Sequence, residues 1–173
     1  MSGNGNSLPP GTRFLLDECL PGEIADALQM VGYPVISCEK AFGGKGRKDR
    51  EDIVPYCSAN HLVWITKDDA ARSEHRKDIE DHRISVVWLR GILRERKKRD
   101  GAVPKLRMQD IHRMLVNKLD EVEATVSSAD HPHYFVLFMR IDRKTEFKRF
   151  ATLTEVSKWL ERPGKRAMSL SHL

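Results

Sequence analysis

The sequence predicts an α/β protein built on a three-layer parallel sheet of at least four strands. Four short apolar runs, each as long as a buried strand, alternate with helical or polar segments over the first half of the chain. Strands that are apolar throughout are typical of parallel sheets whose two faces are both covered. The second half changes to a long amphipathic helix, a hairpin and a final helix, which we expect to follow the parallel core.

The first half divides into four predicted strands and the segments that join them. Pro21 suits a helix start, and apolar residues recur at helical spacing from Ile24 until Gly32 ends the helix. A flexible basic loop is expected over 41–49, then a short helix over about 51–60 that Pro55 limits or bends. Residues 71–82 are so polar that they form a surface helix or a mobile loop. The strands are RFLLDE (13–18), PVISC (34–38), LVWIT (62–66) and ISVVWL (84–89), the last closed by Gly91.

The second half carries its own periodic signals. Apolar residues at intervals of three and four predict one long helix within 105–129. Two apolar runs, 134–141 and 146–150, flank DRKT as in a hairpin. Thr152 and Glu155 have capping-box spacing for a last helix. The expected organisation is a disordered N-terminus (1–12), one domain (13–162) and a frayed tail (163–173), the domain comprising a core with an acidic site (13–90), a basic linker (91–107) and a helix-hairpin-helix extension (108–162).

Composition and cysteine usage narrow the class of protein. The 173 residues are 40% hydrophobic and 32% charged, as in globular domains. No apolar run approaches the roughly 18 residues that span a bilayer, and the first residues lack a secretory signal pattern. The three cysteines form no CxxC pair, which favours reduced thiols over a disulfide framework or a zinc site. We therefore expect a cytoplasmic protein with no membrane partner.

Positive charge gathers in one segment. The chain has a net charge of +5. Residues 90–107 hold eight lysines and arginines against two acids, a local net charge of +6 that leaves about −1 for the rest. A basic stripe on a near-neutral body indicates nucleic-acid binding, although a solvated linker would have the same composition. The candidate RNA contacts are Arg94, Arg96, Lys97, Lys98 and Arg99.

Acidic side chains follow two of the predicted strands. Asp17 and Glu18 end the first, and Asp68 and Asp69 come shortly after the third. In open α/β sheets, ligands bind outside the carboxyl ends of the strands where the strand order reverses. If the first and third strands are neighbours, Asp17 and Asp68 face each other, and close carboxylates resist ionising unless a cation lies between them. Mg²⁺ or Mn²⁺ prefers such oxygen ligands and supports hydrolysis of phosphate esters.

Three residues near the start of one helix are candidates for the third acidic ligand, and the sequence does not choose between them. Glu51 or Asp52 begins that helix and Asp49 precedes it, yet acids are common there because the helix dipole favours them. Asp17 and Asp68 have a comparable structural alternative as strand-end turns or N-caps. The remaining candidates are Thr66, which orients a water or a carboxylate or is only a strand residue, and Lys67, a phosphate contact or a solvated neighbour. We assign Cys19 to packing, His131 and His133 to a loop, and the other histidines to no role.

The first half of the chain contains five segments in this order: RFLLDE, PVISC, the glycine-rich loop GGKG (43–46), EDIVPYC and LVWITKDD. Together they resemble the PIN-like nucleases, closest to the toxin-type branch related to VapC ribonucleases. The resemblance spans roughly residues 13–90. It implies a metal-dependent endoribonuclease that cleaves single-stranded RNA and is silenced by an antitoxin encoded beside it. Asp17 matches the first-strand aspartate, Asp68 the aspartate after the strand-ending threonine (here Thr66), and Asp52 best matches the helix acid, with Glu51 a close competitor.

One departure from the family pattern concerns the acids after the third strand. Related sequences show TxDxDF, whereas this chain has TKDDAA, with Ala70 at the second acidic position. Asp69 either substitutes through a one-residue shift, or a fourth ligand is absent. The pattern TKDDAA therefore leaves open whether the site holds one or two metal ions.

The hypothesis that follows is hydrolysis of an RNA phosphodiester by a Mg²⁺ or Mn²⁺ site. Asp17, Asp52 and Asp68 are the predicted catalytic residues and metal ligands, joined by Asp69 as a further ligand. The supporting residues are Glu18, Glu51, Thr66 and Lys67. The alternative is a catalytically silent module whose acidic cleft binds a basic side chain of a partner. A receiver domain ranks last because residues 88–90 supply no lysine, and a homodimer stays open.

Overall fold

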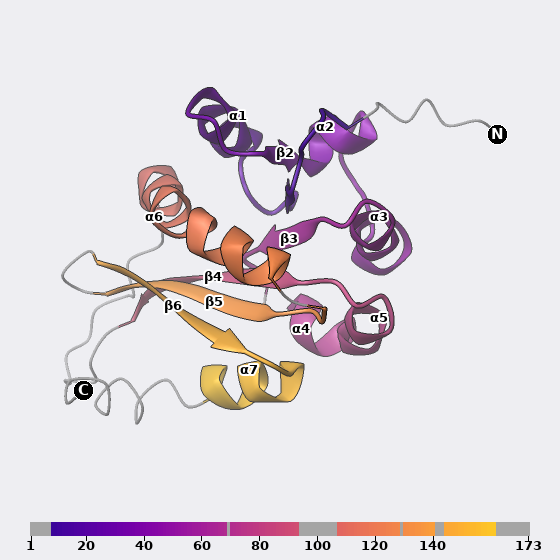
Figure 1. Cartoon of the computed structure of the whole chain (residues 1–173), viewed down its shortest axis with the longest axis vertical. Helices are drawn as coiled ribbons and strands as arrows, with labels where there is room; N and C mark the ends of the chain where they lie inside the picture. The colour runs from indigo at the N-terminus through magenta and orange to yellow at the C-terminus, as the bar shows by residue number, and fades with distance from the viewer. Residues whose placement is uncertain (1–7, 69, 94–106, 129, 141–143, 162–173) are drawn as a thin grey trace.

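The fold is a single six-stranded sheet with the order β2-β1-β3-β4-β5-β6, seen in a computed structural model that describes residues 8–68, 70–93, 107–128, 130–140 and 144–161 (Figure 1). Neighbouring strands from β2 to β5 are parallel, and β6 is antiparallel to β5. The predicted α/β class with a parallel core is therefore confirmed. The strands are β1 (Phe14–Leu16), β2 (Val35–Ser37), β3 (Val63–Thr66), β4 (Val86–Leu93), β5 (Tyr134–Arg140) and β6 (Thr145–Phe150).

Helices cover both faces of the sheet and bury two separate hydrophobic clusters. One cluster joins the sheet to α1 and α6, and the other joins it to α2, α3, α4, α5 and α7. The helical segments are α1 (Gly22–Met30), α2 (Cys38–Phe42), the π-helical turn η1 (Asp49–Ile53), α3 (Val54–Ala59), α4 (Ala70–Glu74), α5 (Arg76–Asp81), α6 (Met108–Ser127) and α7 (Leu153–Leu160). In the described part of the chain, no helix combines the length and apolarity that a bilayer crossing requires.

The continuous apolar runs are explained by burial of both faces of each strand. In β1, Phe14 and Leu16 belong to the cluster with α1 and α6, whereas Leu15 belongs to the cluster on the opposite face. All three are fully buried. Because alternate residues of a strand point to opposite faces, a strand covered on both sides has no position that faces water.

The C-terminal segment completes the sheet. The β5 strand pairs in parallel with β4, and β6 adds the antiparallel edge, as the predicted hairpin requires. Helix α6 lies against the first face, where Met114, Leu115 and Leu119 are fully buried. Helix α7 begins with the predicted capping box, in which Thr152 and Glu155 each accept from the other's backbone N–H. The amphipathic patterns of this half therefore identified the elements correctly.

Three local expectations differ from the structure. The strand β4 continues past Gly91 to Leu93, because a register shift between Arg90 and Ile92 accommodates the glycine within the ladder. A short helix, α2, occupies the beginning of the expected loop. Residues 8–12, expected to be disordered, include a turn in which Thr12 bonds to Pro9 O, and Leu8 packs on the second cluster.

Other predicted segments are divided or lie outside the described residues. The expected helix at 51–60 begins earlier, as η1, and continues as α3 with Pro55 in its first turn, where proline needs no hydrogen-bond partner. The polar segment 71–82 contains two short helices, α4 and α5. Most of the basic linker (94–106), the first seven residues and the tail from 162 onward are outside the described residues.

The strand order decides where the acids meet. Because β1 lies between β2 and β3, the carboxyl ends of β1 and β3 are adjacent. The backbone N–H of Asp17 donates to the carbonyl of Ile65 at 2.9 Å, which continues the ladder one residue beyond β1. The first and third strands are therefore neighbours, which is the condition under which Asp17 and Asp68 were expected to face each other.

Candidate functional site

Asp17 occupies the centre of the acidic edge and its carboxylate is held on both oxygens. One oxygen accepts from the backbone N–H of Glu18 at 2.7 Å. The other accepts from the Thr66 hydroxyl at 2.5 Å and from the Cys19 thiol at 3.1 Å. The residue is only 5% exposed. Donors on both oxygens fix the orientation of a buried carboxylate. Their hydrogen bonds also offset the free-energy cost of removing it from water.

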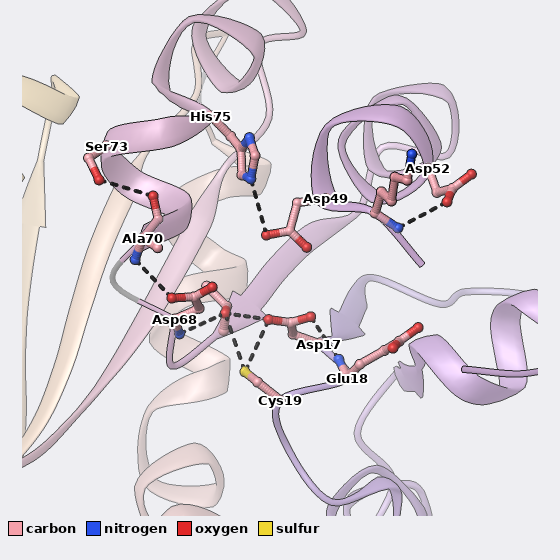
Figure 2. Close-up of polar contacts among 11 residues, drawn as sticks. Asp17, Glu18, Cys19, Asp49, Asp52, Asp68, Ala70, Ser73 and His75 are labelled. Carbon is pink, nitrogen blue, oxygen red and sulfur yellow. Dashed lines mark hydrogen bonds and ion pairs between the residues drawn. The ribbon is translucent and has the colours of Figure 1, made fainter. Parts of the chain in front are cut away.

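Thr66 connects the acids that end β1 and β3. Its side chain is fully buried, and its hydroxyl, while donating to Asp17, accepts from the backbone N–H of Asp68 at 3.0 Å. The Asp68 carboxylate in turn accepts from the N–H of Ala70 at 2.8 Å, at the start of α4. Asp68 therefore has the capping role that its position allowed, and the same network places it beside Asp17 (Figure 2).

Asp49, the first residue of η1, supplies the third carboxylate of the edge. Figure 2 shows Asp17, Asp49 and Asp68 directed toward a common space from three different segments. Burial, followed by the charges of Asp17 and, more weakly, of Asp68 and Glu18, raises the pKa of Asp49 from 3.8 to about 6. His75 Nε2, 3.7 Å from the Asp49 carboxylate, acts in the opposite direction. Negative charge at this edge is thus incompletely compensated.

Asp52, the expected third ligand, lies away from this space. Its carboxylate accepts from the backbone N–H of Lys48 at 3.0 Å, closing its own helical turn, and points away from Asp17 in Figure 2. Glu51 is an exposed partner of Lys48 at 2.8 Å. The helical segment that contains these acids begins with the π-helical turn η1, and in this turn Asp49 faces the strand ends (Figure 2). The structure therefore places Asp49 where we expected Asp52 or Glu51.

Glu18, a predicted supporting residue, binds the backbone of a neighbouring loop. Its two carboxylate oxygens accept from the backbone N–H groups of Gly46 and Arg47, at 2.8 and 2.9 Å. Arg47 is held further by a bond from its guanidinium to the Phe42 carbonyl at 3.1 Å and by its position over the Phe42 ring. Glu18 therefore fastens the basic loop after α2 to the end of β1.

A cavity of about 640 Å³ opens beside the acids. Asp17, Glu18 and Cys19 line it, together with Lys40, Lys45 and the exposed Lys67. Burial, then the neighbouring Asp17 charge, raises the pKa of Cys19 to about 11, so this thiol stays protonated and serves as a hydrogen-bond donor. Three further acids, Glu23, Asp26 and Glu39, line the same cavity, and the last two form ion pairs with Lys40 and Lys45. Asp17 and Glu18 therefore share the cavity with lysines whose charge is largely paired.

The acidic edge has donors of the kind that a divalent cation requires. Asp17, Asp49 and Asp68 offer the oxygen donors that Mg²⁺ or Mn²⁺ prefers, and the pKa of Asp49 is raised by burial and then by the charge of Asp17. Within the described ranges, no three acidic, histidine or cysteine side chains yet form a group that could hold a metal ion. The donor set fits, and binding would require the three carboxylates to draw together. Asp69 and the candidate contacts Arg94, Arg96, Lys97, Lys98 and Arg99 lie outside the described residues.

Comparison with known families adds one finding. Residues 12–91 match a family model described as a PIN-like domain. The match supports a PIN-like domain. The matched segment runs from just before β1 into β4 and includes Asp17, Asp49 and Asp68. No curated protein and no solved structure shows a significant match to the chain.

At this acidic edge, Asp49 received too little weight from the sequence alone, and His75 was not identified. Asp49 was one of three acids within four positions, and the sequence did not reveal the π-helical turn that selects it. His75 stands in a polar segment with no motif, and only the packing of α5 beside η1 brings it to Asp49. The signal that could have favoured Asp49 is its position as the last residue of the expected basic loop, where the helical segment begins.

Proposed function

We propose that the protein is a metal-dependent endoribonuclease that hydrolyses phosphodiesters of single-stranded RNA. The observation that carries the proposal is the convergence of Asp17, Asp49 and Asp68 at the carboxyl ends of β1 and β3, within a segment that matches a PIN-like domain. Asp49 replaces Asp52 in the proposed ligand set because Asp52 points away. The toxin role, with an antitoxin as partner, belongs to the same proposal and follows from the resemblance to the toxin-type branch.

Each residue of the edge has a definable part in this chemistry. The three carboxylates would hold one or two Mg²⁺ or Mn²⁺ ions, which when bound would lower the pKa of water and neutralise charge on the phosphoryl group. Thr66 and the N–H of Glu18 fix the orientation of Asp17, so little rearrangement of that ligand is needed. Glu18 holds the basic loop at the rim of the cavity.

Substrate affinity in this proposal comes from cations outside the acidic centre. Lys45 and Lys67 line the cavity beside Asp17. The basic segment that contains Arg94, Arg96, Lys97, Lys98 and Arg99 follows β4 in the sequence. An acidic site repels a polyanion unless neighbouring positive charge compensates, because phosphate contacts dominate nucleic-acid affinity.

The deciding experiment is a cleavage assay with the purified full chain, free of any antitoxin. Total RNA and a labelled single-stranded RNA are incubated with Mn²⁺, with Mg²⁺ or with EDTA. We expect cleavage with either metal, none with EDTA, and none with Asp17→Asn, whose fold is checked by circular dichroism. Metal-independent cleavage, or full activity of a folded Asp17→Asn variant, would contradict the proposal.

A second candidate is a silent module whose acidic cleft takes a basic side chain from a partner protein. One observation favours it: within the described residues the carboxylates do not yet form a group that could hold a metal ion. Calorimetric titration of the chain with Mn²⁺ separates the two candidates. Saturable binding that Asp17→Asn removes supports the nuclease, and no binding supports the module.

A further inference from the structure

A groove at the opposite end of the sheet gathers basic and imidazole side chains. Its volume is about 480 Å³. Arg13, His61, Arg83 and His131 line it, and each comes one to three residues before β1, β3, β4 or β5, which are consecutive in the sheet. The amino ends of parallel strands lie at one edge of the sheet, and the carboxyl ends, which carry the acids, lie at the opposite edge. The groove is thus separate from the acidic site by the length of the strands.

Two of these side chains stand where the backbone favours glycine. His61 and Arg83 both have φ of 54°. Each is the left-handed residue that ends a helix, because the following N–H groups bond back to the helix, from Leu62 to Cys57 O at 2.9 Å and from Ile84 to Ile79 O at 3.3 Å. Glycine is the usual residue at such a position, and other residues pay a conformational cost there. The same costly substitution occurs at two adjacent strands and brings two nitrogen-bearing side chains to one groove.

Two arginines and two acids, Glu123 and Asp130, line the groove, so the pairing of these groups decides how much positive charge stays available to a ligand. Arg83 donates to a backbone carbonyl, that of Asp130, at 2.8 Å, which satisfies one N–H without neutralising the guanidinium. Arg13 lies 3.8 Å from Glu123, a long and half-exposed pair. His82 is the third imidazole in the lining. The fully or nearly fully buried Phe14, Leu62 and Ile84 form apolar parts of the wall, so polar recognition depends on the basic side chains.

We propose that this groove binds the phosphate group of a phosphorylated ligand. A guanidinium presents several fixed donors that match phosphate oxygens, and imidazoles add further N–H donors. A cation is a poor fit because the two arginines cannot lose their charge. The phosphate is either a free phosphate ester or part of a polynucleotide backbone. The proposal does not depend on the nuclease function, because none of its residues belongs to the acidic edge.

The test is isothermal titration calorimetry of the full chain in EDTA, which keeps metal-dependent chemistry out of the measurement. The probes are inorganic phosphate, a nucleoside 5′-monophosphate, a short single-stranded RNA and acetate. We expect saturable binding of phosphate or the monophosphate below about 10 mM, and weaker or no binding of acetate. The RNA shows which source of phosphate the groove takes: tighter binding than the monophosphate indicates the backbone, and weaker binding indicates a free ester.

Two substitutions separate binding from folding. Arg83→Gly and His61→Gly place glycine where the backbone favours it, so both variants should melt no lower than the wild type. Each should weaken phosphate binding by at least about tenfold, the loss of one charge-assisted contact. Lys77→Gln, an exposed cation outside the groove, is the matched control and should bind as the wild type does. No saturable phosphate binding, acetate binding as tight as phosphate, or unchanged affinity in both glycine variants would overturn the proposal.

Discussion

His75 Nε2 lies 3.7 Å from a carboxylate oxygen of Asp49, so an imidazole stands beside an acid whose charged form is disfavoured by burial and by neighbouring carboxylates. Asp17 and Asp68 face the same acid from the strand ends (Figure 2). The pKa of Asp49 reflects this position: burial and the two aspartates raise it, and His75 opposes them. A cation bound at this edge would favour the ionised form of Asp49 and so oppose the effect of burial and of the two aspartates.

Replacing Asp49 should reduce RNA cleavage far more than replacing Asp52. We expect Asp49→Asn to lower kcat/KM for RNA cleavage in Mn²⁺ by at least about a hundredfold, because loss of even an outer partner of a metal ligand costs 10- to 100-fold. Asp52→Asn is the matched control, since its carboxylate only closes a turn with the Lys48 N–H, and it should retain activity within about tenfold. Equal losses in the two variants would contradict the assignment of Asp49.

Asp49 should also make stability depend on pH in a defined direction. Its pKa in the folded chain is about 6, against 3.8 for the ordinary group, so the folded state binds the proton more tightly than the unfolded state does. The wild type therefore loses stability as pH rises from about 4 to 6. Above pH 6 the difference of about two pKa units corresponds to about 2 to 3 kcal/mol.

Urea unfolding of Asp49→Asn in EDTA tests this dependence. The variant should match the wild type near pH 4 and exceed it by up to about 2 kcal/mol at pH 7, since Asn cannot take the charge. Mn²⁺ should narrow or reverse the difference, because a bound cation favours the ionised wild-type side chain. A stability difference that does not widen between pH 4 and 7 would show that Asp49 is not held at a raised pKa.

Much of this edge could be anticipated from the sequence because the apolar strands determine it. Runs buried on both faces predicted a parallel sheet, and placing the first strand beside the third was enough to bring Asp17 and Asp68 together. The choice among three clustered acids was beyond the sequence, since a π-helical turn, followed by Pro55, sets which one faces the sheet. Contacts between remote segments, such as His75 with Asp49, leave no local pattern to find.

We expect the Thr66 hydroxyl to contribute to both stability and metal binding. Thr66→Val keeps the shape but removes the hydroxyl that donates to Asp17 and accepts from the N–H of Asp68. Leaving these buried partners unsatisfied should cost about 1 to 3 kcal/mol of unfolding free energy, measured in urea. Thr66→Ser retains the hydroxyl and is the control: it should keep Mn²⁺ affinity near the wild-type value while Thr66→Val loses it. Equal Mn²⁺ affinity in both variants would limit Thr66 to a packing role.

Glu18 should control the order of the basic loop. Glu18→Ala removes the acceptor of the Gly46 and Arg47 N–H groups, and we expect those two amides to exchange hydrogen several-fold faster. Glu51→Ala is the matched control, because Glu51 forms only an exposed ion pair with Lys48, which contributes little. Unchanged exchange at Gly46 and Arg47 in Glu18→Ala would mean that the loop is held without this carboxylate.

The basic segment should determine how RNA affinity depends on salt. Replacing Arg96, Lys97, Lys98 and Arg99 with Gln removes up to four phosphate contacts, and each contact to a single strand contributes about 0.7 to the slope of log K against log salt concentration. Fluorescence anisotropy of a labelled single-stranded RNA in EDTA should therefore show a slope smaller by up to about 3. Exchanging four exposed cations elsewhere, Lys77, Arg113, Arg149 and Lys158, controls for the change in net charge and should alter the slope far less. An equal reduction in both variants would mean that RNA responds to overall charge, and an unchanged slope in the first would remove the segment from the RNA-binding surface.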